Sequence, residues 1–258
     1  GALRRCLLSA LVGALVGVLT LAPCAQALQL PPTPAGFDYQ LGGARPVPAS
    51  VTIVARDRND QPIPGLYNIC YVNGFQTQPG ERSFWRKRWQ LVLKQRGQPV
   101  VDRAWGELLL DIRTPRKRRA LTRIVGAWID GCAASGFQAV EFDNLDSFTR
   151  SRGLIRPRHT NSFARLLVQR AHSVGLATAQ KNRAEWDGKS VGFDFVVAEQ
   201  CGEYDECGRY LHNFGSLVLD IEYTTAGFER ACTKWAGALS VVRRDLESLS
   251  NGTRAWCG

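Results

Sequence analysis

The sequence predicts an α/β protein with the fold of a single (β/α)8 TIM barrel, and three observations favour it. Short apolar segments alternate with amphipathic stretches along a chain of 258 residues, a length and an order typical of one barrel. Eight of these segments are five to seven residues long, as the strands of globular proteins are. No Gly-x-Gly-x-x-Gly motif follows the first segment, which counts against the alternative of an open doubly wound sheet.

The strands are expected where apolar and β-branched residues cluster between turn-forming residues. In chain order these segments are 37–41, 51–55, 67–73, 107–112, 139–144, 177–182, 194–199 and 217–223, with a ninth, 253–257, at the end. The connection between the second and third segments, residues 56–66, has no room for a proper helix. One βα unit of the barrel is therefore expected to be incomplete.

Four helices are expected from the spacing of apolar residues and from the residues at the helix ends. The clearest is 115–134, where Thr114 can cap the N-terminus, Pro115 suits the first turn and Gly136 follows the end. Its apolar residues recur at helical spacing: Leu121, Ile124, Trp128 and Cys132. The others are 83–96, which stops at Gly97; 161–174, capped by Thr160 and stopped by Gly175; and 232–250, ended by Gly252.

The chain divides into three segments. Residues 1–27 are interpreted as a secretory signal peptide, with Arg4 and Arg5 before an apolar run and an A-x-A cleavage site at 25–27. Residues 28–36 form a Pro-rich lead, and 37–258 form the barrel domain. After residue 27 no apolar run approaches the ~20 residues that a membrane helix needs. We therefore expect a secreted protein without a membrane span.

Composition and charge exclude some classes of function. Hydrophobic residues make up 45% and charged residues 22% of the chain, which is globular composition and not that of a disordered protein. The formal net charge is +10. The basic run from Arg113 to Arg123 lacks interleaved aromatic residues, so we interpret it as a solvated helix face and not as a nucleic-acid site. Contact with a polyanion or with the cell wall is the alternative.

Six cysteines follow residue 27, and an even number after a secretory signal indicates disulfides. The sequence alone does not determine the pairing. We favour Cys201–Cys207, which closes a short loop, Cys232–Cys257, which ties the last strand to the helix before it, and Cys70–Cys132. A zinc site is the alternative, but the chain has no Cys-x-x-Cys pair and only three histidines. No cofactor is expected.

Side chains of barrel strands alternate between the lumen and the helix layer. In 139–144 the bulky residues Val140 and Phe142 belong under the helices, which places Glu141 and Asp143 in the barrel mouth. In 217–223 the same reasoning places Leu217, Leu219 and Ile221 outside and Val218, Asp220 and Glu222 inside. Further polar residues at strand ends are Asp38, Asp111, Lys181, Asn182 and Glu199.

The carboxylates are thus expected at the carboxyl ends of several strands, the face where barrel active sites form. Burying a carboxylate without a partner costs several kcal/mol, so a group of them indicates either neutralisation by arginines or a chemical role. Hydrolysis by two carboxyl groups, one protonated and one ionised, is the chemistry that suits such a mouth. The histidines show no metal-ligand spacing, and no Gly-x-Ser-x-Gly motif indicates a serine nucleophile.

These strand ends resemble glycoside hydrolase family 114, the endo-α-1,4-polygalactosaminidase family. The most specific stretches are GFQAVEFDNLDSF at 136–148 and FDFVVAEQCGEYDEC at 193–207. Further similar stretches are FDYQLGG at 37–43, YNICYVNGF at 67–75, ELLLDIR at 107–113, AHSVGLATAQKN at 171–182 and LDIEY at 219–223. The resemblance implies a secreted TIM-barrel glycosidase that acts on α-1,4-linked galactosamine polymers.

The resemblance also implies roles for particular residues. Asp143 would be the nucleophile and Glu199 the general acid/base of a retaining enzyme, with the two carboxyl groups roughly 5–5.5 Å apart and not the 6.5–9.5 Å of inverting enzymes. The expected sugar-binding residues are Asp38, Tyr39, Asp111, Glu141, Asn144, Asp146, Lys181, Asn182, Gln200, Glu222 and Tyr223. Carboxylates among them suit a cationic amino sugar.

Two features depart from the expected pattern. A positive net charge repels a polycationic substrate at long range, and the second strand ends in VARDRN, where acids and aromatics are expected. Two alternatives therefore stay open: a carbohydrate-binding barrel without catalysis, and a glycosidase of the same fold that acts on another glycan. The sequence does not indicate an oligomeric state.

Overall fold

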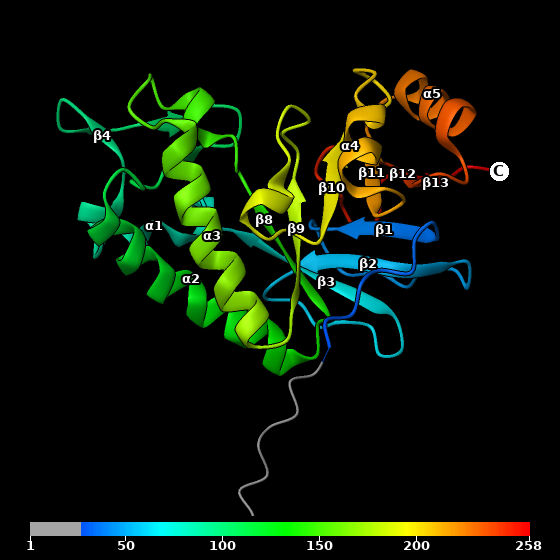
Figure 1. Cartoon of the computed structure of the whole chain (residues 1–258), viewed down its shortest axis with the longest axis horizontal. Coiled ribbons are helices and arrows are strands. Elements are labelled where there is room, and N and C mark those ends of the chain that lie inside the picture. The colour runs from blue at the N-terminus through cyan, green and yellow to red at the C-terminus, as the bar shows by residue number, and fades with distance from the viewer. Residues whose placement is uncertain (1–26) are drawn as a thin grey trace, which may run out of the picture.

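A computed structural model describes residues 27–258, so the expected signal peptide lies outside the described residues except for its last residue. Eight parallel strands follow one another around a nearly closed barrel, and a ninth pairs antiparallel at one edge (Figure 1). They are β1 (Gly36–Gln40), β2 (Val51–Asp57), β3 (Tyr67–Asn73), β8 (Ala139–Asp143), β9 (Ala177–Lys181), β10 (Phe195–Glu199), β11 (Val218–Glu222), β12 (Ser240–Arg244) and the antiparallel β13 (Arg254–Trp256). The predicted barrel fold is confirmed.

The helices pack outside β3 and β9–β12, whereas the β1–β2 and β2–β3 connections contain no helix. Figure 1 shows the two longest helices lying side by side. The helices are α1 (Arg82–Arg86), α2 (Pro115–Ser135), α3 (Pro157–Ser173), α4 (Cys207–Phe214) and α5 (Thr225–Trp235), with short 3-10 turns at Pro79–Glu81, Trp89–Leu91, Ser147–Arg150 and Gly188–Val191. In the described part of the chain, none of them combines the length and the apolar character of a bilayer-crossing helix.

The predicted caps of α2 are present. The side chain of Thr114 accepts a hydrogen bond from the Lys117 backbone N–H, and Gly136 follows the helix in the left-handed conformation that glycine adopts without strain. By contrast, α3 begins at Pro157, before the predicted cap Thr160. Arg156 is its N-cap: the Arg156 backbone N–H donates to His159 Nδ1, and the Arg156 carbonyl oxygen accepts the His159 backbone N–H. The expected helix 83–96 is reduced to α1 and the turn at Trp89–Leu91.

Two element predictions are wrong. The expected helix 232–250 ends at Trp235, and the eighth barrel strand, β12, begins at Ser240 after a turn at Gly237. The expected barrel strand 107–112 belongs instead to a long excursion between β3 and α2, built from two small hairpins. These pair β4 (Lys94–Gln95) with β5 (Gln98–Pro99) and β6 (Val101–Asp102) with β7 (Glu107–Leu108).

The core has two layers, one inside the barrel and one between the strands and the helices. Val140 and Phe142 pack in the outer layer, as predicted, which directs Glu141 and Asp143 inward. In β11 the prediction is reversed. Leu219 and Ile221 fill the lumen, and Asp220 faces the helix layer. Both faces of a parallel barrel strand are buried, so apolar alternation alone cannot tell the two faces apart.

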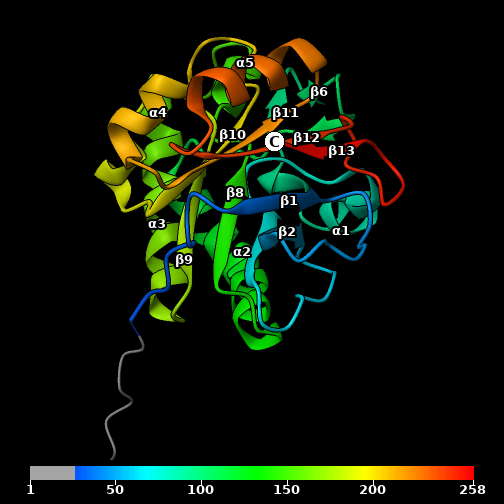
Figure 2. The same ribbon diagram turned by 90° about the vertical axis from the view of Figure 1, so that its right-hand side faces the viewer.

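A buried arginine closes the barrel between its first and last parallel strands. Figure 2 shows β12 and β13 beside β1. Arg244 of β12 is fully buried and donates to the Tyr39 backbone oxygen and to Asp38 of β1, 3.1 Å away. Arg254 of β13 donates to the other Asp38 oxygen at 2.9 Å. Asp38 therefore serves barrel closure and does not lie in the mouth, where it was expected.

We expect Arg244→Met to lower the free energy of unfolding by about 3–5 kcal/mol, because it leaves the buried Asp38 carboxylate with one cation in place of two. Urea denaturation followed by circular dichroism measures this change. Arg243→Met on the same strand is the control, since among residues 27–258 the Arg243 side chain hydrogen-bonds only to the exposed Thr225 hydroxyl. Equal unfolding midpoints for the two variants would contradict the role of Arg244.

Three disulfides form with the pairing favoured from the sequence. Cys70–Cys132 joins β3 to α2, and Cys232–Cys257 joins α5 to the last residues of the chain. Cys201–Cys207 closes a loop of seven residues, 201–207, directly after β10. Each bridge lowers the conformational entropy of the unfolded chain, which typically stabilises the fold by ~2–4 kcal/mol.

Candidate active site

A cleft opens at the carboxyl ends of the barrel strands. Its cavity has a volume of about 400 Å³ and is lined by Tyr39, Tyr71, Asp143, Lys181 and Glu199 from five segments of the barrel mouth, among others. Trp105 and Glu107 of the β6–β7 hairpin form part of one wall. This is the face on which (β/α)8 barrels carry their active sites.

One ammonium group connects three carboxylates at the centre of the cleft. The Nζ atom of Lys181, at the end of β9, lies 3.5 Å from Asp143 Oδ1 and 3.7 Å from both Glu199 Oε2 and Glu141 Oε2. Its side chain is only 2% exposed. Burial alone would lower the pKa of Lys181, but the three carboxylates outweigh burial and raise it well above its usual value. Lys181 is therefore charged at any physiological pH.

Asp143 is held in its ionised form. The Tyr71 hydroxyl donates to Oδ2 at 2.6 Å, and the Asn144 backbone N–H donates to Oδ1 at 2.7 Å. Burial alone would raise the pKa of Asp143. Lys181 and these two hydrogen bonds outweigh it and lower the pKa below its ordinary value. An ionised carboxylate at the cleft surface is the form that a nucleophile requires.

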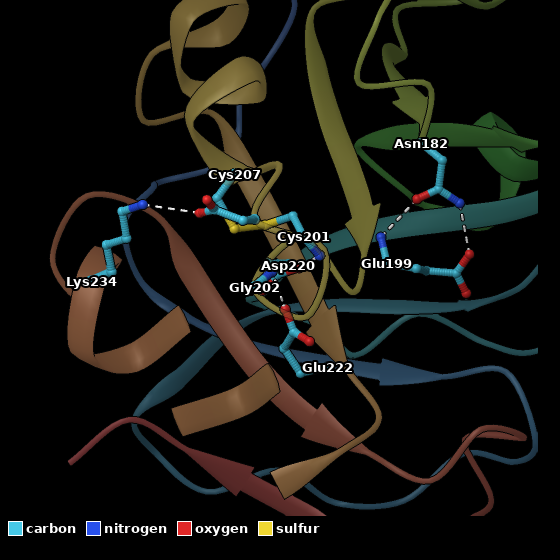
Figure 3. Close-up of a disulfide and its surroundings, with 9 residues drawn as sticks. Asn182, Glu199, Cys201, Gly202, Cys207, Asp220, Glu222 and Lys234 are labelled. Atoms are coloured by element: carbon cyan, nitrogen blue, oxygen red, sulfur yellow. Dashed lines mark hydrogen bonds and ion pairs between the residues drawn. A yellow bond between two sulfur atoms is a disulfide. The ribbon is translucent and has the colours of Figure 1, made fainter. Parts of the chain in front are cut away.

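Glu199 is oriented by two side chains that contact different oxygens. The Tyr223 hydroxyl donates to Oε1 at 2.5 Å, and the Asn182 amide donates to Oε2 at 2.8 Å. Asn182 also accepts a hydrogen bond from the Glu199 backbone N–H, so the two residues bind each other twice (Figure 3). The carboxyl group of Glu199 is thereby fixed toward Lys181.

The residues that follow β8, β9 and β10 share an unusual backbone conformation. Asn144, Asn182 and Gln200 have φ values of 68°, 54° and 60°, in the left-handed region that asparagine tolerates better than most residues. Each strand therefore turns sharply as it leaves the barrel. This turn leaves Asp143, Lys181 and Glu199, the last residues of their strands, pointing into the cleft.

The two candidate catalytic carboxyl groups share one cation. Asp143 Oδ1 and Glu199 Oε2 both lie within 3.7 Å of Lys181 Nζ, so these oxygens are at most twice that distance apart. The limit includes the roughly 5–5.5 Å separation of retaining glycosidases and only the lower edge of the 6.5–9.5 Å range of inverting ones. The geometry is therefore compatible with two carboxyl groups acting on one bond.

Glu141 lies beneath the cleft and is fully buried. Its Oε2 accepts a hydrogen bond from the Tyr39 hydroxyl at 3.1 Å, and its Oε1 has no partner among residues 27–258. Burial and, to a lesser extent, the Asp143 charge raise the pKa of Glu141 to about 7, although Lys181 opposes them. Glu141 has no exposed surface and does not line the cleft, where a sugar-binding residue was expected. It is instead a partner of Lys181 and Tyr39.

The cleft and its immediate extension bring together most of the residues singled out in the sequence: Tyr39, Asp143, Asn144, Asp146, Lys181, Asn182, Glu199, Gln200 and Tyr223. Two further predictions of position are wrong, besides those for Asp38 and Glu141. Asp111 lies at the start of α2, where Arg113 and Lys117 outweigh its burial and lower its pKa to about 2. Glu222 lies beside the disulfide loop, separate from Glu199, and accepts the Gly202 N–H at 2.5 Å (Figure 3).

Several cleft residues were missed in the sequence, notably Tyr71, Trp105, Glu107 and Leu246. Tyr71 shares the inward face of β3 with Ile69, so strand alternation alone could have found it. Trp105 and Glu107 lie in the β3–α2 excursion and Leu246 lies after β12. No local signal relates these segments to the mouth, because their positions depend on tertiary packing.

The described residues contain one group with the composition of a metal site, formed by Cys201, Cys207 and Asp220. The two sulfur atoms are joined in a disulfide, so neither is a thiolate that could bind a metal. Asp220 instead accepts the Cys201 N–H at 3.1 Å. This group therefore fits a structural role in the 201–207 loop.

A (β/α)8 barrel whose mouth brings paired carboxyl groups into one cleft has the architecture of a glycoside hydrolase. The family model described as glycoside-hydrolase family GH114 matches residues 19–258. The chain belongs to this family, and the protein is a glycoside hydrolase. A sequence comparison with curated proteins gives no significant match.

Solved structures show the same fold. Ega3 from Aspergillus fumigatus, in complex with galactosamine, superposes with a TM-score of 0.69 at 20% identity, over 90% of this chain and 98% of that chain. The glycoside hydrolase domain of PelA from Pseudomonas aeruginosa gives a TM-score of 0.59 at 15% identity, over 84% of this chain and 97% of that one. At these identities the similarity establishes the barrel fold.

Proposed function

We propose that the protein is a secreted, endo-acting glycosidase that cleaves α-1,4-linked galactosamine polysaccharide with retention of the anomeric configuration. The observation that carries the proposal is the shared ammonium of Lys181, within 3.7 Å of both Asp143 and Glu199. Family membership supplies the reaction class, and Ega3, a structure of the same fold, was solved with galactosamine.

In the proposed mechanism Asp143 attacks the anomeric carbon while Glu199 gives a proton to the departing glycosidic oxygen. The bond between the anomeric carbon and that oxygen breaks, and the sugar becomes an ester of Asp143. Glu199 then removes a proton from water, which attacks the same carbon and releases Asp143. Lys181 and Tyr71 keep Asp143 ionised before the attack, and Tyr223 and Asn182 hold Glu199 in place.

The shape of the cleft supports endo action. Beyond Glu199 a second hollow continues the cleft, lined by Asp146, Asn182, Gln200 and Tyr204. Glu199 lines both hollows, so the proposed cleavage point lies between two stretches of binding surface. Exposed aromatic side chains, on which sugar rings can stack, occur on each side: Trp105 at 48% and Tyr204 at 64% exposure.

The charge of the cleft supports a cationic substrate despite the basic protein. The first hollow is lined by five acids, Asp57, Glu107, Asp143, Glu199 and Glu247, against a single cation, Lys181. A cleft lined by one sign of charge focuses the field and attracts ligands of the opposite sign. The local field at the cleft therefore favours a polymer of cationic amino sugars, even though the net charge of +10 repels it at long range.

Three polymers test the proposal: deacetylated α-1,4-galactosamine, its N-acetylated form and a neutral α-galactan. We expect new reducing ends from the galactosamine polymer, oligomers of intermediate length early in the reaction, and α-anomers as the first products in proton NMR spectra. First products in the β-configuration would indicate inversion. Binding without new reducing ends would indicate a carbohydrate-binding barrel. Cleavage of the α-galactan alone would indicate a different substrate.

A further inference from the structure

Glu107 is a cleft carboxylate whose hydrogen-bond partners are all neutral. Its Oε2 accepts from the Gln76 amide at 2.8 Å, the Asn73 amide at 3.1 Å and the Asn144 amide at 3.4 Å. Gln76 and Asn73 are 1% and 4% exposed, so buried side chains fix the orientation of Glu107. Its Oε1 makes no hydrogen bond or ion pair to residues 27–258. Glu107 itself lines the cleft.

Three acids near Glu107 each have a cation. Asp102 and Asp146 lie 3.2 Å and 2.9 Å from Arg150, and Asp143 lies 3.5 Å from Lys181. Burial raises the pKa of Glu107, the charges of Asp143 and Asp102 add to it, and the amides only partly oppose them. A positively charged ligand group that bound Oε1 would therefore offset the repulsion between Glu107 and the neighbouring carboxylates. It would also form a charge-assisted hydrogen bond.

The position of Glu107 relates it to the reacting sugar. Asn144 connects the two carboxylates: its backbone N–H binds Asp143 and its side-chain amide binds Glu107. In a 2-amino sugar the nitrogen sits on the carbon next to the anomeric carbon, which Asp143 attacks in the proposed mechanism. The ammonium of the sugar being cleaved would thus lie close to Asp143, and Glu107 is the carboxylate that Asn144 connects to Asp143. Trp105, two residues before Glu107, lines the same cleft and can stack on that sugar.

We infer that Glu107 determines specificity by binding the free ammonium group of the sugar whose glycosidic bond is cleaved, so that the enzyme prefers deacetylated over N-acetylated galactosamine units. This inference rests on the proposed function and deepens it. An acetamide group is neutral and bulkier than an ammonium group. It cannot form the charge-assisted hydrogen bond, and it would leave the carboxylate beside Asp143 uncompensated.

Glu107→Gln tests the inference with the full chain and two matched oligosaccharide series, fully deacetylated and fully N-acetylated. Glutamine keeps the shape of the side chain and an oxygen that accepts from Gln76 and Asn73. Loss of a hydrogen bond to a charged group corresponds to roughly a 10- to 100-fold change. We expect kcat/KM to fall by about that factor for the deacetylated series and by less than about twofold for the acetylated series. Glu229→Gln is the control, because Glu229 is exposed on α5 and is not among the residues that line the cleft or its extensions.

Two further variants keep the test decisive if the Glu107→Gln protein is poorly folded. Glu107→Asp retains the charge and should retain part of the preference, while Trp105→Ala should weaken both series alike, because stacking does not depend on charge. An equal loss for both series in Glu107→Gln, with an unchanged melting temperature, would overturn the inference and leave the proposed function standing. A wild-type enzyme that cleaves neither series would contradict both the inference and the proposed function.

Discussion

Asp143→Asn is expected to reduce the hydrolysis of the galactosamine polymer by three orders of magnitude or more, which corresponds to ~4 kcal/mol or more of lost transition-state stabilisation. Asparagine has nearly the same shape, and its oxygen can still accept the bond from Tyr71 or from Asn144. It lacks the negative charge that attacks the anomeric carbon. The initial rate of reducing-end formation, with the melting temperature of each variant, measures the effect.

Glu199→Ala should behave differently, although its loss on the natural polymer is expected to be just as large. A substrate with a good leaving group needs no proton for the first step, so this variant should still form the sugar ester on Asp143. Added azide can then attack the ester in place of the activated water. We expect azide to restore turnover of an aryl α-glycoside by Glu199→Ala, with an α-glycosyl azide as product.

No such rescue to an α-product is expected for Asp143→Asn, because the ester cannot form. Asp130→Asn, an exposed acid on α2 that pairs with Arg170, provides the control for a change from acid to amide. If azide restored turnover to an α-product in Asp143→Asn but not in Glu199→Ala, the roles of Asp143 and Glu199 would be exchanged. Wild-type turnover in both would remove the mechanism altogether.

The sequence sufficed for the parts of the barrel where each strand carries its own signal. Asp143 and Glu199 lie at the ends of β8 and β10, as the strand predictions place them. In β8 the bulky Val140 and Phe142 also indicate which side meets the helices. The same argument failed at β11, where Leu219 and Ile221 are as apolar as any outward pair but fill the lumen. Asp220 and Glu222 face outward because backbone N–H groups of the 201–207 loop bind them there.

The strand β12 was mistaken for helix because Trp235, Leu239 and Val242 recur at helical spacing. Two adjacent β-branched residues, Val241 and Val242, indicate a strand, but the longer apolar pattern outweighed them. Closure of the barrel then depends on Arg244, whose charge gave no hint that it would be buried. Similarly, Trp105 and Glu107 reach the cleft through an excursion whose course is set by packing against β3 and α2.

Lys181→Met is expected to affect both stability and activity. Methionine fills the volume of lysine without its charge, so Asp143, Glu141 and Glu199 would face one another with no cation. Removing one member of a buried ion pair costs about 3–5 kcal/mol, and we expect a loss of that size in the free energy of unfolding at neutral pH. The exposed Lys189, changed to methionine, is the control and should alter stability by less than about 0.5 kcal/mol.

The sign of the pH dependence separates this ion-pair role from simple packing. Lys181 lowers the pKa of Asp143, so an ionised Asp143 stabilises the fold above its unfolded pKa, and this stability is lost as the pH falls through its folded pKa. In Lys181→Met the contribution is absent, and the deficit relative to wild type should be largest near neutral pH and shrink on acidification. A deficit of constant size from neutral to acidic pH would indicate lost packing only.

Activity should follow the same logic. The nucleophile must be ionised, and without the ammonium group the pKa of Asp143 rises. The acid limb of the kcat/KM profile should therefore move to higher pH in Lys181→Met, whereas Lys189→Met should leave it in place. Because Lys181 also lowers the pKa of Glu141 from what burial alone would set, its loss makes Glu141 neutral at pH 7. One buried ammonium thus determines which carboxyl groups of the mouth carry charge, and this in turn determines whether Asp143 can attack.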